Sequence, residues 1–138
     1  MFANQLNAQY MKKQILVVDD EPSILQLLKL IFSKDYDVVL KGNGYDAMLW
    51  LEEANHPDLI ILDVEMPYFN GPEFLKSIKI SGLFRDIPVI ILSVTEDSDS
   101  LYKRTPYAIE RFIKKPFDPV MLKKVVNELL NDVSHEQL

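Results

Sequence analysis

The sequence contains no cysteine, which excludes a disulfide framework and a thiolate metal site. No uninterrupted apolar run is long enough to span a bilayer, and the first residues carry no basic leader followed by a continuous apolar stretch. Its 15 Lys and Arg are outnumbered by 21 Asp and Glu, and they form no basic stripe that would bind a phosphate backbone. We therefore expect a cytoplasmic protein that contacts neither membrane nor nucleic acid directly.

What is present has the balance of one soluble globular domain. The 138 residues are 48% hydrophobic and 26% charged, with no repeat and no low-complexity tract. We assign residues 13–132 to this domain, residues 1–12 to an N-terminal extension and residues 133–138 to a C-terminal tail. The sequence leaves open whether the protein acts alone or belongs to a longer chain.

Short β-rich runs alternate with helical patterns along the chain. β-rich runs occupy residues 14–18, 36–40, 59–62, 88–92 and 111–114, and the apolar stretch in the first is typical of a strand buried on both faces. After the first run, Pro22 suits the first turn of a helix, and apolar residues follow at i, i+3, i+4 and i+7 from Ile24. Pro72 and Pro119 open later helical stripes in the same way. The alternation predicts an α/β fold, with a five-stranded parallel sheet covered by helices on both faces.

The segment between Val94 and Ile109 fits this pattern badly. A fourth helix is expected there, but Asp-Ser-Asp-Ser over residues 97–100 favours turns and caps. Pro106 cannot lie inside a helix without removing a hydrogen bond. We predict a short or irregular fourth helix.

Polar residues that stand at the ends of these strands predict a site. Asp19 and Asp20 follow the first strand, Asp63 the third, Ser93 the fourth and Lys115 the fifth. The carboxyl ends of parallel strands meet at one edge, where open α/β folds bind their ligands. Three close carboxylates need a positive partner to stay ionised, and an all-oxygen set without His or Cys selects Mg²⁺. Together, Mg²⁺ and the Lys115 ammonium balance their charge.

This arrangement prepares Asp63 for phosphoryl transfer. A carboxylate oxygen can attack a phosphoryl group and form an acyl phosphate, but both groups are anionic. A metal ion and Lys115 would offset that repulsion, and the Ser93 hydroxyl could donate to a phosphoryl oxygen. The new dianionic group would then pull Ser93 inward and move the backbone.

The chain resembles the response-regulator receiver domains of two-component systems, the family that includes the bacterial chemotaxis receiver. The motifs that carry the resemblance lie in the family order and cover roughly residues 13–132: Ile15–Pro22 (ILVVDDEP), Leu59–Pro67 (LIILDVEMP) with Asn70-Gly71, Leu92-Ser93 and Lys115–Phe117 (KPF). It implies a doubly wound, flavodoxin-like sheet with strand order 2-1-3-4-5.

The resemblance also implies a metal site and a phosphoacceptor. Asp63 would accept the phosphoryl group, and Asp20 and Asp63 would ligate Mg²⁺ directly. The backbone carbonyl of Glu65 would complete the protein ligands, while Asp19 would act mainly through a bound water. The direction of the Glu65 side chain does not follow from the sequence.

The remaining roles implied by the family concern switching and partners. Lys115 takes the lysine position, and Ser93 and Phe112 take the positions of the switch hydroxyl and the switch aromatic. A histidine kinase or a histidine phosphotransfer protein would donate the phosphoryl group from a phosphohistidine. The domain would be no enzyme beyond its own phosphorylation and dephosphorylation; its output partner is unknown, and a homodimer is left open.

Other interpretations are weaker. Asp19, Asp20 and Glu21 could simply favour a helix N-terminus. A phosphatase of the haloacid-dehalogenase-like class would carry its Asp motif near the chain start, and the glycines around Asn43 lack the spacing of a phosphate-binding loop. A phosphorelay intermediate and a phosphorylation-independent interaction module of the same fold remain the alternatives.

Overall fold

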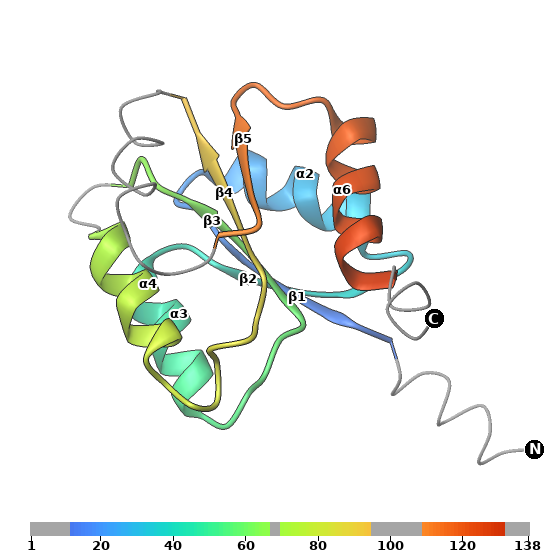
Figure 1. The fold of residues 1–138 in the computed structure, drawn as a ribbon. Coiled ribbons are helices and arrows are strands. Elements are labelled where there is room, and N and C mark those ends of the chain that lie inside the picture. The colour runs from blue at the N-terminus through green and yellow to red at the C-terminus, as the bar shows by residue number, and fades with distance from the viewer. Residues whose placement is uncertain (1–11, 67–69, 95–108, 132–138) are drawn as a thin grey trace, which may run out of the picture.

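A computed structural model describes residues 12–66, 70–94 and 109–131. Its centre is a five-stranded sheet with the order β2-β1-β3-β4-β5, in which every neighbouring pair is parallel. Figure 1 shows this sheet between two layers of helices. The predicted α/β class and the strand order 2-1-3-4-5 are confirmed.

From β1 to β4, strands and helices alternate as the apolar pattern predicts. The strands are β1 (Gln14–Val18), β2 (Asp37–Lys41), β3 (Leu59–Asp63), β4 (Val89–Ser93) and β5 (Arg111–Lys114). The helices are α2 (Pro22–Phe32), α3 (Gly44–Glu52), α4 (Gly71–Lys79) and α6 (Pro119–Asn131). None of the helices in the described ranges is long and apolar enough to cross a bilayer.

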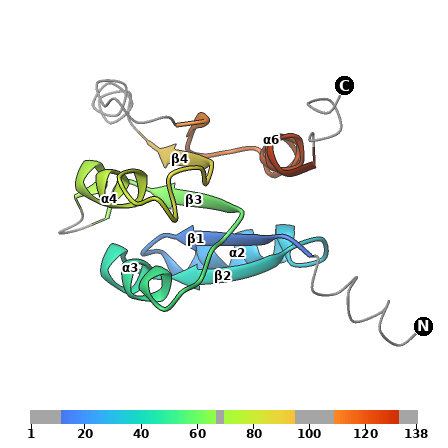
Figure 2. The same ribbon diagram turned by 60° about the horizontal axis from the view of Figure 1, so that its bottom comes forward.

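Alternate residues of the strands pack into two separate hydrophobic cores, one on each face of the sheet. Leu16, Ile60 and Ile91 face α3 and α4, where they join the buried Leu51, Phe74 and Ile78. Their neighbours in sequence face α2 and α6 and pack with the buried side chains Leu28, Phe32, Leu122 and Val126. The views in Figures 1 and 2 agree that α3 and α4 lie on one side of the sheet and α2 and α6 on the other. Strands covered on both faces explain the continuous apolar runs.

Side-chain caps fix where two of the helices begin. The side chain of Asn43 accepts a hydrogen bond from the Asp46 amide at the start of α3. Asn70 caps α4 in the same way, through the Glu73 amide. These bonds satisfy amides that have no partner inside the helix. The segment around Asn43 is therefore an ordinary helix start.

The start of the second strand differs from the prediction, and some predicted segments lie outside the described residues. The second strand begins at Asp37 rather than at Tyr36, because the Tyr36 amide donates to Phe32 in the turn after α2. The predicted irregular fourth helix falls on residues 95–108, outside the described residues. The predicted tail and all of the extension except Lys12 also lie outside them.

Candidate functional site

The five site residues predicted from the sequence come together at the carboxyl-terminal edge of the sheet. Asp19 directly follows β1, and its amide extends the ladder by donating to the Lys41 carbonyl at 3.1 Å. Asp63 and Ser93 are the last residues of β3 and β4. Lys115 follows β5, and its amide donates to the Ser93 carbonyl at 2.8 Å. The backbone ladder therefore fixes the position of these residues.

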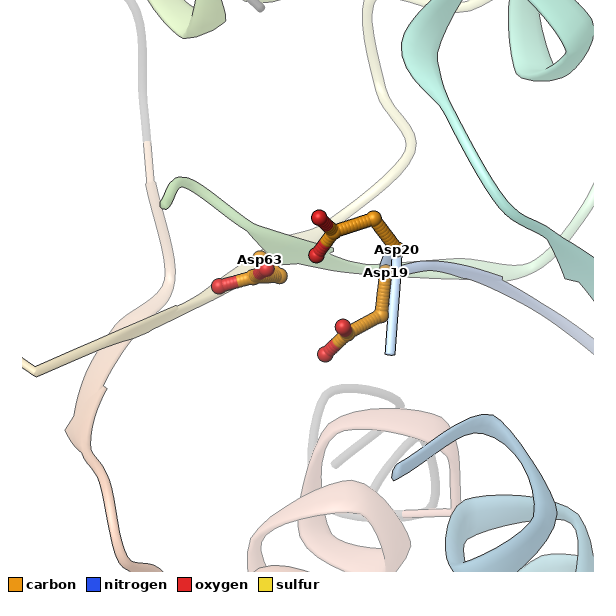
Figure 3. A group of neighbouring side chains, drawn as sticks. All are labelled: Asp19, Asp20 and Asp63. Carbon is orange, nitrogen blue, oxygen red and sulfur yellow. The ribbon is translucent and has the colours of Figure 1, made fainter. Parts of the chain in front are cut away.

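Three carboxylates form a cluster at this edge. Oxygen atoms of Asp19, Asp20 and Asp63 all lie within 4.8 Å of one another. In Figure 3 the side chains of Asp19 and Asp20 diverge from consecutive positions, and both point to the side on which Asp63 lies. Asp19 and Asp63 are each 1% exposed, whereas Asp20 faces solvent. The cluster thus combines two buried anions with one that is open to an incoming group.

The Lys115 ammonium contacts both buried carboxylates. Its Nζ lies 2.8 Å from Asp63 Oδ1 and 3.5 Å from Asp19 Oδ2, and its side chain is 12% exposed. Asp63 Oδ1 also accepts a hydrogen bond from the Glu65 amide at 3.2 Å. Within the described parts of the chain, no donor reaches the other oxygen of Asp63. One oxygen is therefore held while the second is available for chemistry.

Burial and mutual repulsion shift the proton equilibria of this cluster. Burial, together with the charge of Asp63, raises the pKa of Asp19 to about 6, against the opposing effects of the Glu21 amide and Lys115. Burial by itself would lower the pKa of Lys115, but its hydrogen bond and attraction to Asp63 outweigh it and raise that pKa. Lys115 stays an ammonium, yet one cation does not fully compensate the acids. A further cation would complete the balance.

The side chain of Glu65 turns toward the end of β4. Its Oε2 accepts a hydrogen bond from Ser93 Oγ at 3.0 Å, and its Oε1 accepts one from the Val94 amide at 2.8 Å. Ser93 is 5% exposed and Val94 is 48% exposed, so this contact runs from a buried hydroxyl to an amide near the surface. The sequence assigned a role only to the backbone carbonyl of Glu65. Its place two residues after Asp63 was the available signal, because side chains two apart in extended backbone point to the same side.

Phe112 is placed at a distance from the acids. It lies in β5, is half-buried, and packs against the core that contains α3 and α4. β5 pairs with β4, so Phe112 stands opposite Ile91, two residues before Ser93. The geometry puts the predicted switch aromatic on the strand next to the predicted switch hydroxyl.

The acids after β1 are not caps for α2. Glu21 holds the N-cap position without a side-chain hydrogen bond, and Asp19 accepts a hydrogen bond from the Glu21 amide at 2.9 Å. That bond turns Asp19 back toward the sheet edge. The simpler interpretation of this acidic run therefore accounts for little of its geometry.

Several known proteins with similar sequences or folds are named as response regulators or receiver domains. The response regulator SaeR of Staphylococcus aureus is 36% identical over 118 residues, which are 84% of this chain and 50% of that protein. The receiver domain of a signal transduction histidine kinase from Syntrophus aciditrophicus has a TM-score of 0.76 at 34% identity, covering 88% of this chain and 92% of that one. For the chemotaxis response regulator CheY4 of Vibrio cholerae the TM-score is 0.77 at 26% identity, over 87% and 100%.

These relatives differ in length as well as in name. The chain spans about half the length of the curated relatives that it matches, such as SaeR. The family described as the response regulator receiver domain matches residues 15–127, which include β1 apart from Gln14 and most of α6. With the five-stranded parallel sheet and the acids at its edge, this match establishes that the chain belongs to the response-regulator receiver domain family of two-component systems.

Proposed function

We propose that Asp63 accepts a phosphoryl group from a phosphohistidine and that this modification switches the domain. The observation that carries the proposal is the position of the Asp63 carboxylate, which is buried, 2.8 Å from the Lys115 ammonium and within 4.8 Å of two further acids. A salt bridge with only a structural role would not need Asp19 and Asp20 beside it. A site that binds a phosphoryl group together with a metal cation would need such additional acids to hold the cation.

Magnesium fits the donor set. The available ligands are carboxylate and carbonyl oxygens, and among the described residues no His or Cys joins the cluster. Asp20, Asp63 and the backbone carbonyl of Glu65 would hold the ion, and Asp19 would act through a water molecule. When bound, Mg²⁺ neutralises negative charge on the entering phosphoryl oxygens.

The covalent step is an exchange of one bond for another. An Asp63 oxygen attacks phosphorus and an O–P bond forms, while the P–N bond of the donor breaks and its electron pair stays on the histidine nitrogen. Lys115 remains protonated and offsets the charge that develops. In dephosphorylation, which ends the signal, water attacks phosphorus, the O–P bond to Asp63 breaks, and inorganic phosphate leaves.

Ser93 and Phe112 would convert this step into a change of shape. The Ser93 hydroxyl stands at the end of the strand beside β3, within the same edge as Asp63. A phosphoryl oxygen would accept from it, and its movement would make room for the Phe112 ring on the neighbouring strand. A histidine kinase or a histidine phosphotransfer protein is the partner that such chemistry requires.

Two alternatives are kept because the chain spans only part of its relatives. It could pass the phosphoryl group onward as a phosphorelay intermediate, or bind partners without modification. SaeR and the similar proteins named as transcriptional regulators are about twice as long, so an output such as DNA binding would belong to another part of a longer protein.

Phosphoryl incorporation tests the proposal directly. With acetyl phosphate and Mg²⁺, the wild type should gain one phosphoryl group by intact-mass measurement, and Asp63→Asn and Asp63→Ala should gain none. Asp58→Asn is the matched control, because Asp58 precedes the opposite end of β3, where it accepts from the Gln14 amide. Labelling that persists in both Asp63 variants, or that is absent from the wild type, would refute the proposal.

A further inference from the structure

The Glu65 carboxylate binds two donors beside the strand end that carries Asp63. Its two oxygens accept separately from two adjacent donors, the Ser93 hydroxyl at 3.0 Å and the Val94 amide at 2.8 Å. Ser93 is the last residue of β4 and Val94 follows it, beside the end of β3 that carries Asp63. A carboxylate therefore bridges two consecutive donors, one buried and one near the surface.

Such a donor pair has no preference for carboxylate over phosphoryl oxygen. A hydroxyl and a backbone amide that point to one place bind any oxyanion whose oxygens match their separation, and charge strengthens both bonds. The register Asp63↔Leu92 puts Ser93 one residue beyond the partner of Asp63. A phosphoryl group on Asp63 would thus meet donors that Glu65 already uses.

We propose that Glu65 is an internal competitor of the phosphoryl group: in the unmodified domain its carboxylate occupies the Ser93 hydroxyl and the Val94 amide, and it must leave them when Asp63 is modified. This inference rests on the proposed function. It makes Glu65 a positioning residue that slows phosphoryl acceptance and holds the end of β4 in its unmodified place.

The competition has two consequences. Removing the carboxylate breaks its bonds to both donors, so phosphoryl acceptance should become faster by at least about tenfold, the effect of losing one such charge-assisted hydrogen bond from the ground state. Modification of Asp63 expels the Glu65 side chain, so the Glu65 carboxylate leaves the two donors when the phosphoryl group binds them. The Glu65 backbone carbonyl, the proposed metal ligand, is unchanged by any side-chain substitution.

Two variants separate competition from simple charge repulsion. Glu65→Ala removes both acceptors and the charge. Glu65→Gln removes the charge but keeps one carbonyl oxygen for the Val94 amide, while its NH₂ group cannot accept from Ser93. If repulsion alone slowed acceptance, the two variants would be equally fast. Competition predicts that Glu65→Gln lies between the wild type and Glu65→Ala.

Glu110 provides the matched control, because its carboxylate binds the opposite end of β4. Its Oε1 accepts from the Val89 amide, the first residue of β4, at 2.9 Å. Glu110→Ala therefore removes a carboxylate-to-amide bond from β4 without touching the Asp63 edge. Its labelling rate should equal that of the wild type.

The experiment combines amide NMR with labelling by acetyl phosphate and Mg²⁺. In the unmodified protein, Glu65→Ala should shift the Val94 amide resonance and speed its hydrogen exchange, whereas Glu110→Ala should leave Val94 unchanged. Labelling rates should rise in the order wild type, Glu65→Gln, Glu65→Ala. In a Ser93→Ala background, the gain from Glu65→Ala should shrink, because one of the contested donors is gone.

Each failure has a different meaning. A wild type that is labelled on Asp63 at the same rate as Glu65→Ala would overturn the competition and leave the proposed function standing. A Val94 amide that does not respond to Glu65→Ala, or equal rates for Glu65→Gln and Glu65→Ala, would also overturn it. A wild type that is never labelled would overturn the proposed function, and the competition with it.

Discussion

The carboxyl groups of Asp19 and Asp63 are each 1% exposed, and the Lys115 ammonium contacts both of them. At the scale of residues, the negative charge of the cluster exceeds the one positive charge of Lys115, because Asp20 adds a further acid. Burial and the neighbouring charge of Asp63 therefore raise the pKa of Asp19 to about 6. The repulsion among these carboxylates is what a bound metal ion would relieve, and the ion would in turn attract a phosphoryl group.

Replacing Asp19 should stabilise the metal-free domain. Because the pKa of Asp19 is raised on folding, its proton-linked stability is present below about pH 4 and is lost as the pH rises through about 6. Asp19→Asn does not suffer this loss, and we expect it to be more stable by about 1–3 kcal/mol at pH 7.5 than the wild type. Urea denaturation with a chelator present measures the difference.

The comparison at two pH values is the control for this prediction. The advantage of Asp19→Asn should be smaller at pH 5, where the wild-type carboxyl is largely protonated. Asp37→Asn, which changes an exposed acid at the start of β2, should show little difference at either pH. An Asp19→Asn protein that is less stable than the wild type at pH 7.5 would contradict the prediction.

At the scale of elements, α4 is tied to the loop that leads into β4. Lys79, in the last turn of α4, is 7% exposed, and its Nζ donates to the carbonyls of Ile87 at 2.8 Å and Arg85 at 3.1 Å. Burial lowers the pKa of this lysine. β4 carries Ser93 at its far end, so the link also helps to set the strand that the site depends on.

Lys79→Met should lower the free energy of unfolding by about 1–3 kcal/mol. Met retains much of the apolar stem, but the two carbonyls lose their donor, and unsatisfied buried polar groups are costly. Lys76→Met is the matched control, because Lys76 lies on the same helix and faces solvent. Chemical denaturation measures both variants, and equal stabilities would show that the ammonium contributes nothing net.

At the scale of the whole molecule, the sheet edge joins the ends of four strands into one binding surface. Asp19 follows β1, Asp63 ends β3, Ser93 ends β4 and Lys115 follows β5. A ligand at this edge would contact residues at the ends of several strands, and its binding free energy would add to global stability.

Millimolar Mg²⁺ should raise the thermal midpoint of the wild type. A ligand at ten times its dissociation constant stabilises the folded state by about 1.4 kcal/mol. Asp20→Asn removes an exposed acid from the cluster without disturbing the buried pair, and it should lose most of this gain. Sodium chloride of equal ionic strength serves as the control. The same midpoint shift in Asp20→Asn would place the ion elsewhere.

The sequence by itself determined the α/β architecture. Residues 59–62 and 15–18 are continuously apolar because both faces of their strands are covered, and this pattern is local enough to be predicted. The same logic predicted that Asp63 and Lys115 meet, since both follow parallel strands. Their roles in phosphorylation stay predictions.

Only the tertiary structure decided the direction of the Glu65 side chain, the two carbonyls that Lys79 reaches, and the position of Tyr36 before β2 rather than in it. Each depends on donors and acceptors that lie outside the residue's own element, or on a turn that competes with the strand. A local pattern records which face a residue takes, but a hydrogen bond also needs its partner's position, and packing alone supplies that.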